Sequence, residues 1–253
     1  MLRRRDQQSS KETSGGISRP DADISAPPAQ QRRRALFFQI YVITTIFLFA
    51  GLALLARTQA YLDIDLFISR FLQSFDAPWF AALMAAVSWP GFAPQALLVI
   101  GIFSLLVFWL GEPWEGVVSL AAAGAVQALN FLVKLLVARP RPSADLVSVV
   151  EELASYSFPS GHVMFYTAFF GFLYFLTFSL LRRSLRRTLL LFFFGSLVVL
   201  VGPSRIYLGQ HWASDVLGGY LLGSLTLAVV ILVYRWGKER SFLQSGANPD
   251  TGR

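Results

Sequence analysis

Both histidines of the chain lie in short polar segments whose residues could handle a phosphate group. His211 stands four residues before Asp215. If the two share one face of a helix, the carboxylate can accept a hydrogen bond from one imidazole nitrogen and leave the other nitrogen free to attack. The pair therefore predicts His211 as a nucleophile that Asp215 orients.

The other histidine, His162, follows Ser160 and Gly161 at the expected start of a helix. Ser160 can cap this helix, Gly161 allows a ligand close to the backbone, and the first amides of a helix have no partner within it. Such a helix start can bind an anion. His162, in the first turn, could supply a proton to the bound group near neutral pH.

A third polar segment, just upstream, contributes cations. Lys134 lies near the end of an apolar stretch, and Arg141 follows after six residues. Pro140 and Pro142 prevent the helix from continuing, so we expect Arg141 in an extended segment that folds back toward Lys134. Two cations could then face one anion. The alternative is that Lys134 and Arg139 or Arg141 only extend toward water at the membrane boundary.

Arg205 lies six residues before His211 and offers two parallel N–H donors to phosphate oxygens. Two histidines and an aspartate could instead be three ligands of a zinc ion. Lys134, Arg141 and Arg205 would repel that cation and attract a dianion, so we predict a phosphate site and no metal. A purely structural role for these polar residues is the remaining alternative.

The composition indicates an integral membrane protein. The 253 residues are 55% hydrophobic with a mean hydropathy of +0.53, which exceeds the level of an ordinary soluble domain. Six apolar runs predict an all-α, polytopic bundle of six transmembrane helices, and the first run is too long for the apolar core of a signal peptide. The runs span residues 35–56, 94–110, 117–138, 163–181, 188–203 and 216–234.

Basic residues predict the orientation in the membrane. Residues 1–34 form a polar, basic segment that we expect to be a disordered cytoplasmic tail. The basic loop 182–187 and the basic stretch 235–240, before a cytoplasmic tail at 237–253, then fall on the same side, as the positive-inside rule requires. Alternation of the spans puts all three polar segments on the extracytoplasmic side of an inner or plasma membrane.

The loop after the first span has helical spacing of its own. Apolar residues recur on one side of residues 62–76, with acidic and basic residues elsewhere around the helix. This pattern predicts an amphipathic helix that either packs on the bundle or lies at the membrane interface near a route for lipid entry. Residues 79–89 could form a further short helix that stops at Pro90.

The net charge of +7 does not indicate a nucleic-acid partner, because the basic residues lie in tails, one loop and the three polar segments. Without cysteines, the chain has neither a disulfide nor a thiolate metal site.

The three segments together resemble the tripartite signature of the type 2 phosphatidic acid phosphatase superfamily. The resemblance extends over residues 35–236, and it implies that His211 forms a phosphohistidine, that Asp215 orients it, and that His162 protonates the leaving oxygen and then activates water. It further implies a reaction without a metal or another cofactor. Phosphoryl binding is implied for Lys134, Arg141, Ser160, Gly161 and Arg205.

The resemblance implies hydrolysis of an amphipathic lipid phosphate monoester or diphosphate, such as phosphatidic acid, phosphatidylglycerol phosphate, a sphingoid phosphate or a polyprenyl diphosphate. Six spans argue against the soluble haloperoxidases, which share the signature. Two alternatives stay open: a phosphotransferase that passes the phosphoryl group to a lipid acceptor, and a transporter of anions or phospholipids that breaks no bond. Membrane lipids are the other expected partners, and the sequence gives no oligomeric state.

Overall fold

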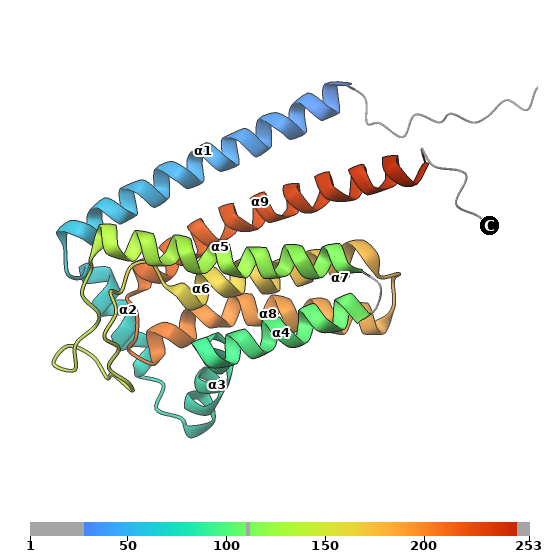
Figure 1. The fold of residues 1–253 in the computed structure, drawn as a ribbon. Coiled ribbons are helices and arrows are strands. Elements are labelled where there is room, and N and C mark those ends of the chain that lie inside the picture. Colours follow the sequence, from blue (N-terminus) through green and yellow to red (C-terminus); the bar gives the residue numbers. More distant parts are fainter. Residues whose placement is uncertain (1–27, 110–111, 247–253) are drawn as a thin grey trace, which may run out of the picture. The chain divides into compact units, whose positions relative to one another are not determined.

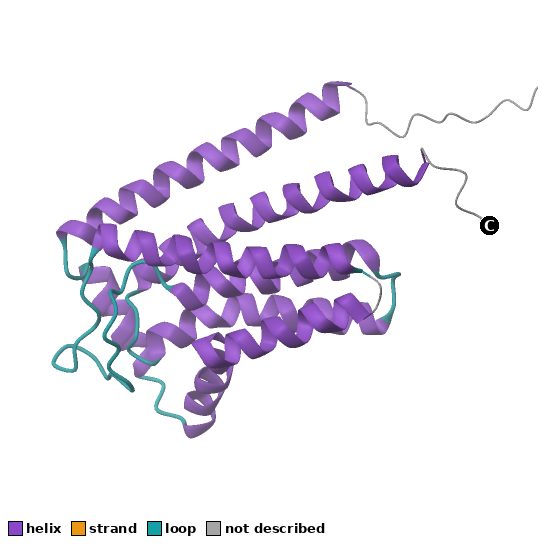
Figure 2. Ribbon diagram, in the orientation of Figure 1, coloured by secondary structure: helices purple, strands orange, loops and turns teal. Residues whose placement is uncertain are grey.

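The computed structural model describes residues 28–109 and 112–246, which form helices and loops without any strand (Figures 1 and 2). The chain divides into two compact units, residues 1–39 and 40–253, and all contacts discussed below lie within the second. The elements are α1 (Pro28–Thr58), α2 (Asp63–Gln73), α3 (Pro78–Ser88), η1 (Trp89–Gly91), α4 (Ala93–Trp109), α5 (Pro113–Val137), α6 (Gly161–Phe165), η2 (Tyr166–Phe170), α7 (Gly171–Leu180), α8 (Leu185–Tyr207) and α9 (Ala213–Gly246).

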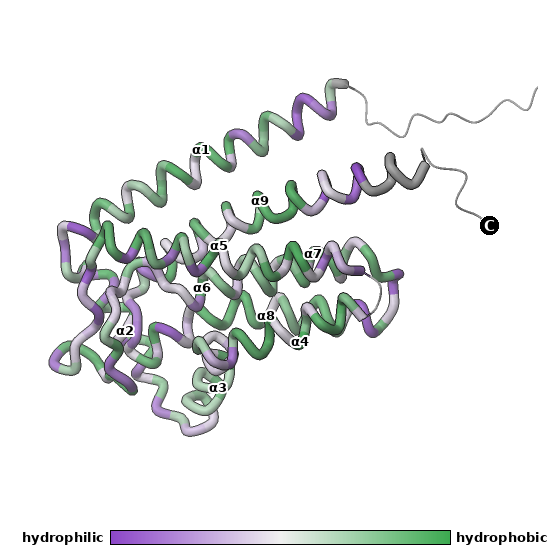
Figure 3. The backbone as a smooth tube through the Cα atoms, viewed as in Figure 1, coloured by the Kyte–Doolittle hydropathy of each residue, from purple (hydrophilic) through white to green (hydrophobic). Residues whose placement is uncertain are grey.

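Five helical stretches of the described chain are long and apolar enough to cross a membrane, which confirms the predicted all-helical membrane protein (Figure 3). A sixth span exists if α3 with η1 and α4, which meet at an angle of 65°, count together. The second predicted span, 94–110, is therefore one arm of a bent pair. The bend follows Pro90, whose ring cannot continue a regular helix, as the sequence predicted for the end of α3.

The end of the predicted disordered N-terminal tail is helical, because α1 begins at Pro28 and so includes residues 28–34. Helix α9 continues to Gly246, so residues 237–246 of the predicted C-terminal tail are also helical. The polar ends of these helices contain arginine, glutamine and lysine, which extend a helix at little cost. The remainder of the two predicted tails, 1–27 and 247–253, lies outside the described residues.

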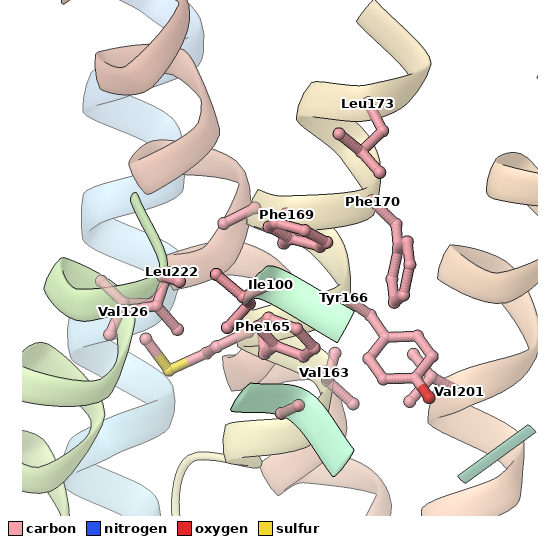
Figure 4. Packing of buried hydrophobic residues seen from close by; sticks show 14 of the residues in the cluster. Ile100, Val126, Val163, Phe165, Tyr166, Phe169, Phe170, Leu173, Val201 and Leu222 are labelled. Carbon is pink, nitrogen blue, oxygen red and sulfur yellow. The ribbon is translucent and has the colours of Figure 1, made fainter. Parts of the chain in front are cut away.

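The continuous span Gly161–Leu180, which comprises α6, η2 and α7, is the most enclosed of the bundle. Its apolar window is 67% buried, compared with 28 to 39% for α5, α8 and α9. Phe165 and Phe169 from this span belong to a core cluster with buried residues of α3, α4, α5, α8 and α9, among them Val126 of α5 and Leu222 of α9 (Figure 4). Burial of these large rings fixes the span, and with it the position of His162 in its first turn.

Helix α2 turns its aromatic side chains outward. Phe67 and Phe71 are 65% and 55% exposed, whereas Asp65 and Ser69 are fully buried against the protein. In water this arrangement would be unfavourable, but at a bilayer the outward side meets lipid instead. Helix α2 therefore directs a carboxylate toward the polar segments.

The loops that carry these segments gather at one end of the bundle (Figure 2). After Val137 the chain reverses through Ala138, whose φ of 53° is left-handed and whose amide donates to the Lys134 carbonyl. The long loop 138–160 then leads into α6 beside the turn between α8 and α9. All three predicted segments consequently lie at the same end.

Candidate active site

Hydrogen bonds join the three polar segments at this end. The Ser160 amide donates to the Asp215 carbonyl at 3.1 Å, which links the start of α6 to the start of α9. The Arg141 guanidinium donates to the Gln210 carbonyl at 2.5 Å, which links the loop after α5 to the same turn. Residues separated by up to about eighty positions in the sequence thus form one cluster, as the sequence predicted.

His211 lies in the turn before α9, not on the helix, because the helix begins only at Ala213. The expectation that His211 and Asp215 share a helix face is therefore wrong. The distance from His211 Nδ1 to Asp215 Oδ2 is 3.6 Å, too long for a direct hydrogen bond. Ser157 Oγ bridges the pair, at 3.4 Å from Nδ1 and 2.5 Å from Oδ2.

The second ring nitrogen of His211 faces a cation. Arg141 Nη1 lies 3.2 Å from Nε2, and since a guanidinium can only donate, Nε2 is the acceptor and the ring proton is on Nδ1. Burial first, and then the positive charges of Arg141, Lys134 and Arg205, hold the pKa of His211 well below 6.5. At neutral pH, Nε2 therefore presents an unprotonated lone pair.

Lys134 and Arg141 both bind the short stretch 155–157. Lys134 Nζ donates to the carbonyls of Tyr156 and, at 3.3 Å, Ser157. Arg141 Nε donates to the Ser155 carbonyl at 2.7 Å, and Nη2 donates to the Ser155 hydroxyl at 2.9 Å. The segment after Pro140 thus folds back toward the end of α5, as predicted. It brings the two cations to the same three residues of the loop, 155–157.

Several buried polar atoms near the start of α6 have no hydrogen-bond partner among the described residues. They are Ser160 Oγ, His162 Nε2, and Nε and Nη2 of Arg205. Ser160 occupies the N-cap position of α6, as predicted. The prediction that its side chain caps the helix is wrong, because the side chain forms no capping hydrogen bond. Buried polar groups almost always have a partner, so these atoms indicate a site built for a polar ligand.

The bend between α3 and α4 forms one wall of this region. Arg205 Nη1 donates to the Ser88 hydroxyl, and the guanidinium carbon lies 5.4 Å from the centre of the Phe92 ring. The same ring meets His162 edge to face at 5.0 Å. A Cβ atom on Gly91 would lie 2.3 Å from the His162 ring. The wall therefore fixes both side chains and leaves their remaining donors free for a ligand.

Sequence reasoning missed several residues here. From the sequence, Arg139 is a basic residue at the membrane boundary that lacks the spacing of Arg141 from Lys134, yet its side chain is fully buried between Asp65 and Asp215, at 2.9 and 2.7 Å. Ser157, between His211 and Asp215, was not singled out. A buried arginine needs a carboxylate partner, and Asp65, one of three acidic residues in 62–76, could have provided that signal.

The cluster has the electrostatic character of an anion site. Arg139 neutralises carboxylates, whereas Lys134, Arg141 and Arg205 have no acidic partner among the described salt bridges. Among the described residues, no three His, Cys, Asp or Glu side chains gather in a way that could hold a metal ion. The geometry thus combines an imidazole lone pair, a second imidazole and three cations, a set of groups that suits the binding and attack of an anionic substrate.

Comparisons with known proteins identify a family and a relative that the chain resembles. Residues 113–240 match the model of the PAP2 superfamily. The chain is 34% identical over 193 residues to phosphatidylglycerophosphatase B of Bacillus subtilis (strain 168). The aligned region covers 76% of this chain and 94% of that protein.

Two solved structures have a similar fold. The first, described as the first transmembrane PAP2 type phosphatidylglycerolphosphate phosphatase from Bacillus subtilis, aligns with a TM-score of 0.66 at 28% identity, over 85% of this chain and 100% of that one. LpxE of Aquifex aeolicus aligns with a TM-score of 0.54 at 22% identity, over 67% of this chain and 96% of that one. The second likeness concerns the fold alone.

Proposed function

The chain belongs to the PAP2 superfamily, and from this membership we propose that it is a membrane phosphatase that hydrolyses a lipid phosphate monoester through a phosphohistidine at His211. The observation that carries the proposal is a set of buried polar atoms of Ser160, His162 and Arg205, without a partner among the described residues, near the neutral imidazole of His211. A phosphate dianion supplies the acceptors that the donors among these atoms lack.

Phosphatidylglycerol phosphate is the first substrate to test. A relative with 34% identity over most of its length is named phosphatidylglycerophosphatase B, and the more similar of the two solved structures is described as a phosphatase of the same lipid. The donors of the proposed site suit any phosphate group and do not distinguish one lipid from another, so the choice of lipid rests on these relatives.

In the first chemical step, His211 Nε2 attacks phosphorus and the bond between phosphorus and the lipid oxygen breaks. The bonding electron pair leaves with that oxygen, which takes a proton from His162. Lys134, Arg141 and Arg205 stabilise the negative charge on the three equatorial oxygens, together with the first amides of α6. The products are a lipid alcohol and a phosphohistidine.

In the second step, water attacks the phosphohistidine and the bond between phosphorus and nitrogen breaks. His162, now neutral, accepts a proton from the water, and the electron pair returns to His211 Nε2. Ser157 and Asp215 keep the Nδ1 proton in place, so the same nitrogen is free at the end of the cycle. No step requires a metal or another cofactor.

We also propose that the site faces the extracytoplasmic side. The basic stretch 182–187, which contains four arginines in the loop after α7 and the first turn of α8, lies at the opposite end of the bundle from the polar loops (Figure 1). The positive-inside rule favours the cytoplasm for that loop. A cysteine introduced at position 143 is expected to react with an impermeant thiol reagent added from outside the cell.

The test is a phosphate-release assay with purified protein in lipid nanodiscs. We expect release from phosphatidylglycerol phosphate, and a fall of about 10⁴-fold or more in His211→Ala, because the attacking atom is lost. Phosphatidic acid and a polyprenyl diphosphate are assayed in parallel, and rapid acid-free quenching with radiolabelled substrate traps the phosphohistidine.

Gly101→Ala is the matched control, because a Cβ there meets nothing within 4 Å. Undiminished phosphate release by His211→Ala would overturn the proposal, as would complete loss of activity in a chelator that an added metal restores. Label appearing on a lipid acceptor instead of in free phosphate would identify a phosphotransferase.

A further inference from the structure

Arg139 forms a buried ionic chain behind the nucleophile. Its Nη1 donates to Asp215 Oδ1 at 2.7 Å, and its Nη2 donates to Asp65 Oδ2 at 2.9 Å. All three side chains are fully buried. Together with Ser157 and His211, they connect α2 to the imidazole through an unbroken series of contacts.

Phosphate binding does not account for Arg139. Its charge is already paired with two carboxylates, and its remaining donor, Nε, binds the Ala60 carbonyl at 3.2 Å. Arg205 differs, because two of its nitrogens have no partner among the described residues. The two buried arginines therefore have different tasks, and that of Arg139 concerns the carboxylates.

Asp65 also holds the start of α9. Its Oδ1 accepts from the Ser214 amide at 2.7 Å, and its Oδ2 accepts from the Ser214 hydroxyl at 2.7 Å. Asp215 is the next residue, and its own Oδ2 accepts from the Trp212 amide at 2.9 Å. The carboxylate that faces His211 is thus fixed on both sides, by α2 through Asp65 and by the loop after α5 through Arg139.

The charges of the chain suit the proposed reaction. One guanidinium between two carboxylates leaves a net charge of −1, buried beside an imidazole that becomes cationic when its Nε2 bonds to phosphorus. In a low-dielectric site such a charge stabilises the positive ring much more than it would in water. Arg139 at the same time binds Asp215 Oδ1, so the carboxylate cannot move toward the imidazole without losing that ion pair.

We propose that Arg139 and Asp65 are positioning residues of the reaction, which act through Asp215 and Ser157 on His211. The proposal rests on the proposed phosphohistidine mechanism. It makes α2, which lies outside the matched residues 113–240, a part of the catalytic unit.

The test compares kcat and KM of Arg139→Met and Asp65→Asn with those of the unmodified enzyme. We expect kcat to fall about 100-fold in Arg139→Met while KM changes less than about twofold, because phosphate contacts remain and only the orientation of the nucleophile is lost. Asp65→Asn should lose about 10-fold, and Arg139→Lys should fall between Arg139→Met and the unmodified enzyme, because it keeps the charge without two parallel donors. Formation of the trapped phosphohistidine should slow in the same proportion as kcat.

Arg70→Met is the matched control. Arg70 also ties α2 to the loop after α5, through the Leu146 carbonyl at 3.3 Å, but it does not contact Asp215. Its kcat should stay within about twofold of the unmodified enzyme. A similar loss in Arg70→Met would mean that α2 only needs to be attached, and would overturn the positioning role.

Misfolding is distinguished by the inhibition constant of inorganic phosphate, which reports the cations of the site. An unchanged constant with a lowered kcat supports positioning, whereas loss of both in every variant, Arg139→Lys included, contradicts it. If His211→Ala is inactive while Arg139→Met and Asp65→Asn keep normal kcat, this inference fails alone. If His211→Ala is active, the proposed function itself fails.

Discussion

The two sides of the active site differ in how far the protein itself satisfies their polar groups. On the nucleophile side, formed by Arg139, Ser157, His211 and Asp215, the carboxylate of Asp215 accepts from Arg139, Ser157 and the Trp212 amide. On the phosphate side, formed by Ser160, His162 and Arg205, four buried atoms have no partner among the described residues. The first side is organised before substrate arrives, and the second is completed by the substrate.

This difference follows from what each side does in the proposed reaction. A nucleophile gains from a fixed orientation, because each rotation that is frozen in advance lowers the barrier to attack. A phosphate pocket needs donors that the protein leaves unused, because a donor already paired would have to break one bond to form another. Stability is concentrated on one side and ligand affinity on the other.

The largest effect that would sharpen this comparison is expected from Arg205→Met. Activity should fall by about 10² to 10³-fold, because one set of donors to the phosphoryl oxygens is lost. The melting temperature in phosphate-free buffer should stay constant or rise, because a buried charge without a carboxylate partner is removed. Phosphate release and thermal unfolding measure the two quantities.

Arg139→Met provides the contrast in the same unfolding experiment. Its removal leaves Asp65 and Asp215 buried without their cation, and breaking a buried pair in this way costs about 3 to 5 kcal/mol. The melting temperature should therefore fall clearly. Equal losses of stability in both arginine variants would show that the two sides do not differ as described.

A smaller effect is expected from Gly91→Ala, which acts on the phosphate side through shape. The new Cβ would lie 2.3 Å from His162 Cδ2, so the imidazole has to move. A displacement of this size should lower kcat about 10- to 100-fold for lipid phosphates. Gly101→Ala, on the other arm of the same bent pair and with nothing within 4 Å, should leave kcat unchanged. Normal turnover in Gly91→Ala would show that the bend between α3 and α4 does not hold His162 in its active position.

The smallest effect concerns the pH dependence of the nucleophile side. Burial and the nearby cations lower the pKa of His211 below its ordinary value of 6.5, so the ring stays neutral as the pH falls through that value. The unfolded chain binds a proton there that the folded protein does not, so stability should decline below pH 6.5 by up to about 1.4 kcal/mol per pH unit. It should not depend on this group at higher pH.

The measurement is simple because the chain has two histidines. In ¹⁵N-histidine-labelled, untagged protein, the His211 signals should retain the pattern of a neutral ring protonated at Nδ1 when a free imidazole is already charged. His162→Gln assigns the remaining signals to His211. A ring that titrates at its ordinary pKa would contradict the burial and electrostatic environment assigned to the nucleophile.

The membrane class, most of the spans and the members of the three polar segments could be predicted from the sequence. Apolar runs of sufficient length have few stable alternatives to a transmembrane helix, and Pro140 and Pro142 had to end α5 nearby. The bend before the second span could not be predicted, because its apolar length gave no indication that α3 and α4 meet at 65°. The helix at residues 28–34, the end of the predicted N-terminal tail, was also missed, since polar composition alone does not exclude a helix that extends from an apolar one.

The orientation of α2 shows why a periodic pattern was not enough. Its spacing predicts one apolar and one polar side, but not which of them faces the bundle. Tertiary packing buries Asp65 beside Arg139 and leaves Phe67 and Phe71 outside. A buried carboxylate is stable only with its cation, and that cation lies 74 residues further along the chain.

The sequence by itself determined which residues carry the chemistry, because their types and spacing within each segment are local properties. Only the tertiary structure decided how they are connected: Ser157 between His211 and Asp215, Arg139 between two carboxylates, and Gly91 and Phe92 against His162. These contacts join helices and loops that are distant in sequence. They form because buried polar groups must find partners among whatever the packing of the bundle brings near them.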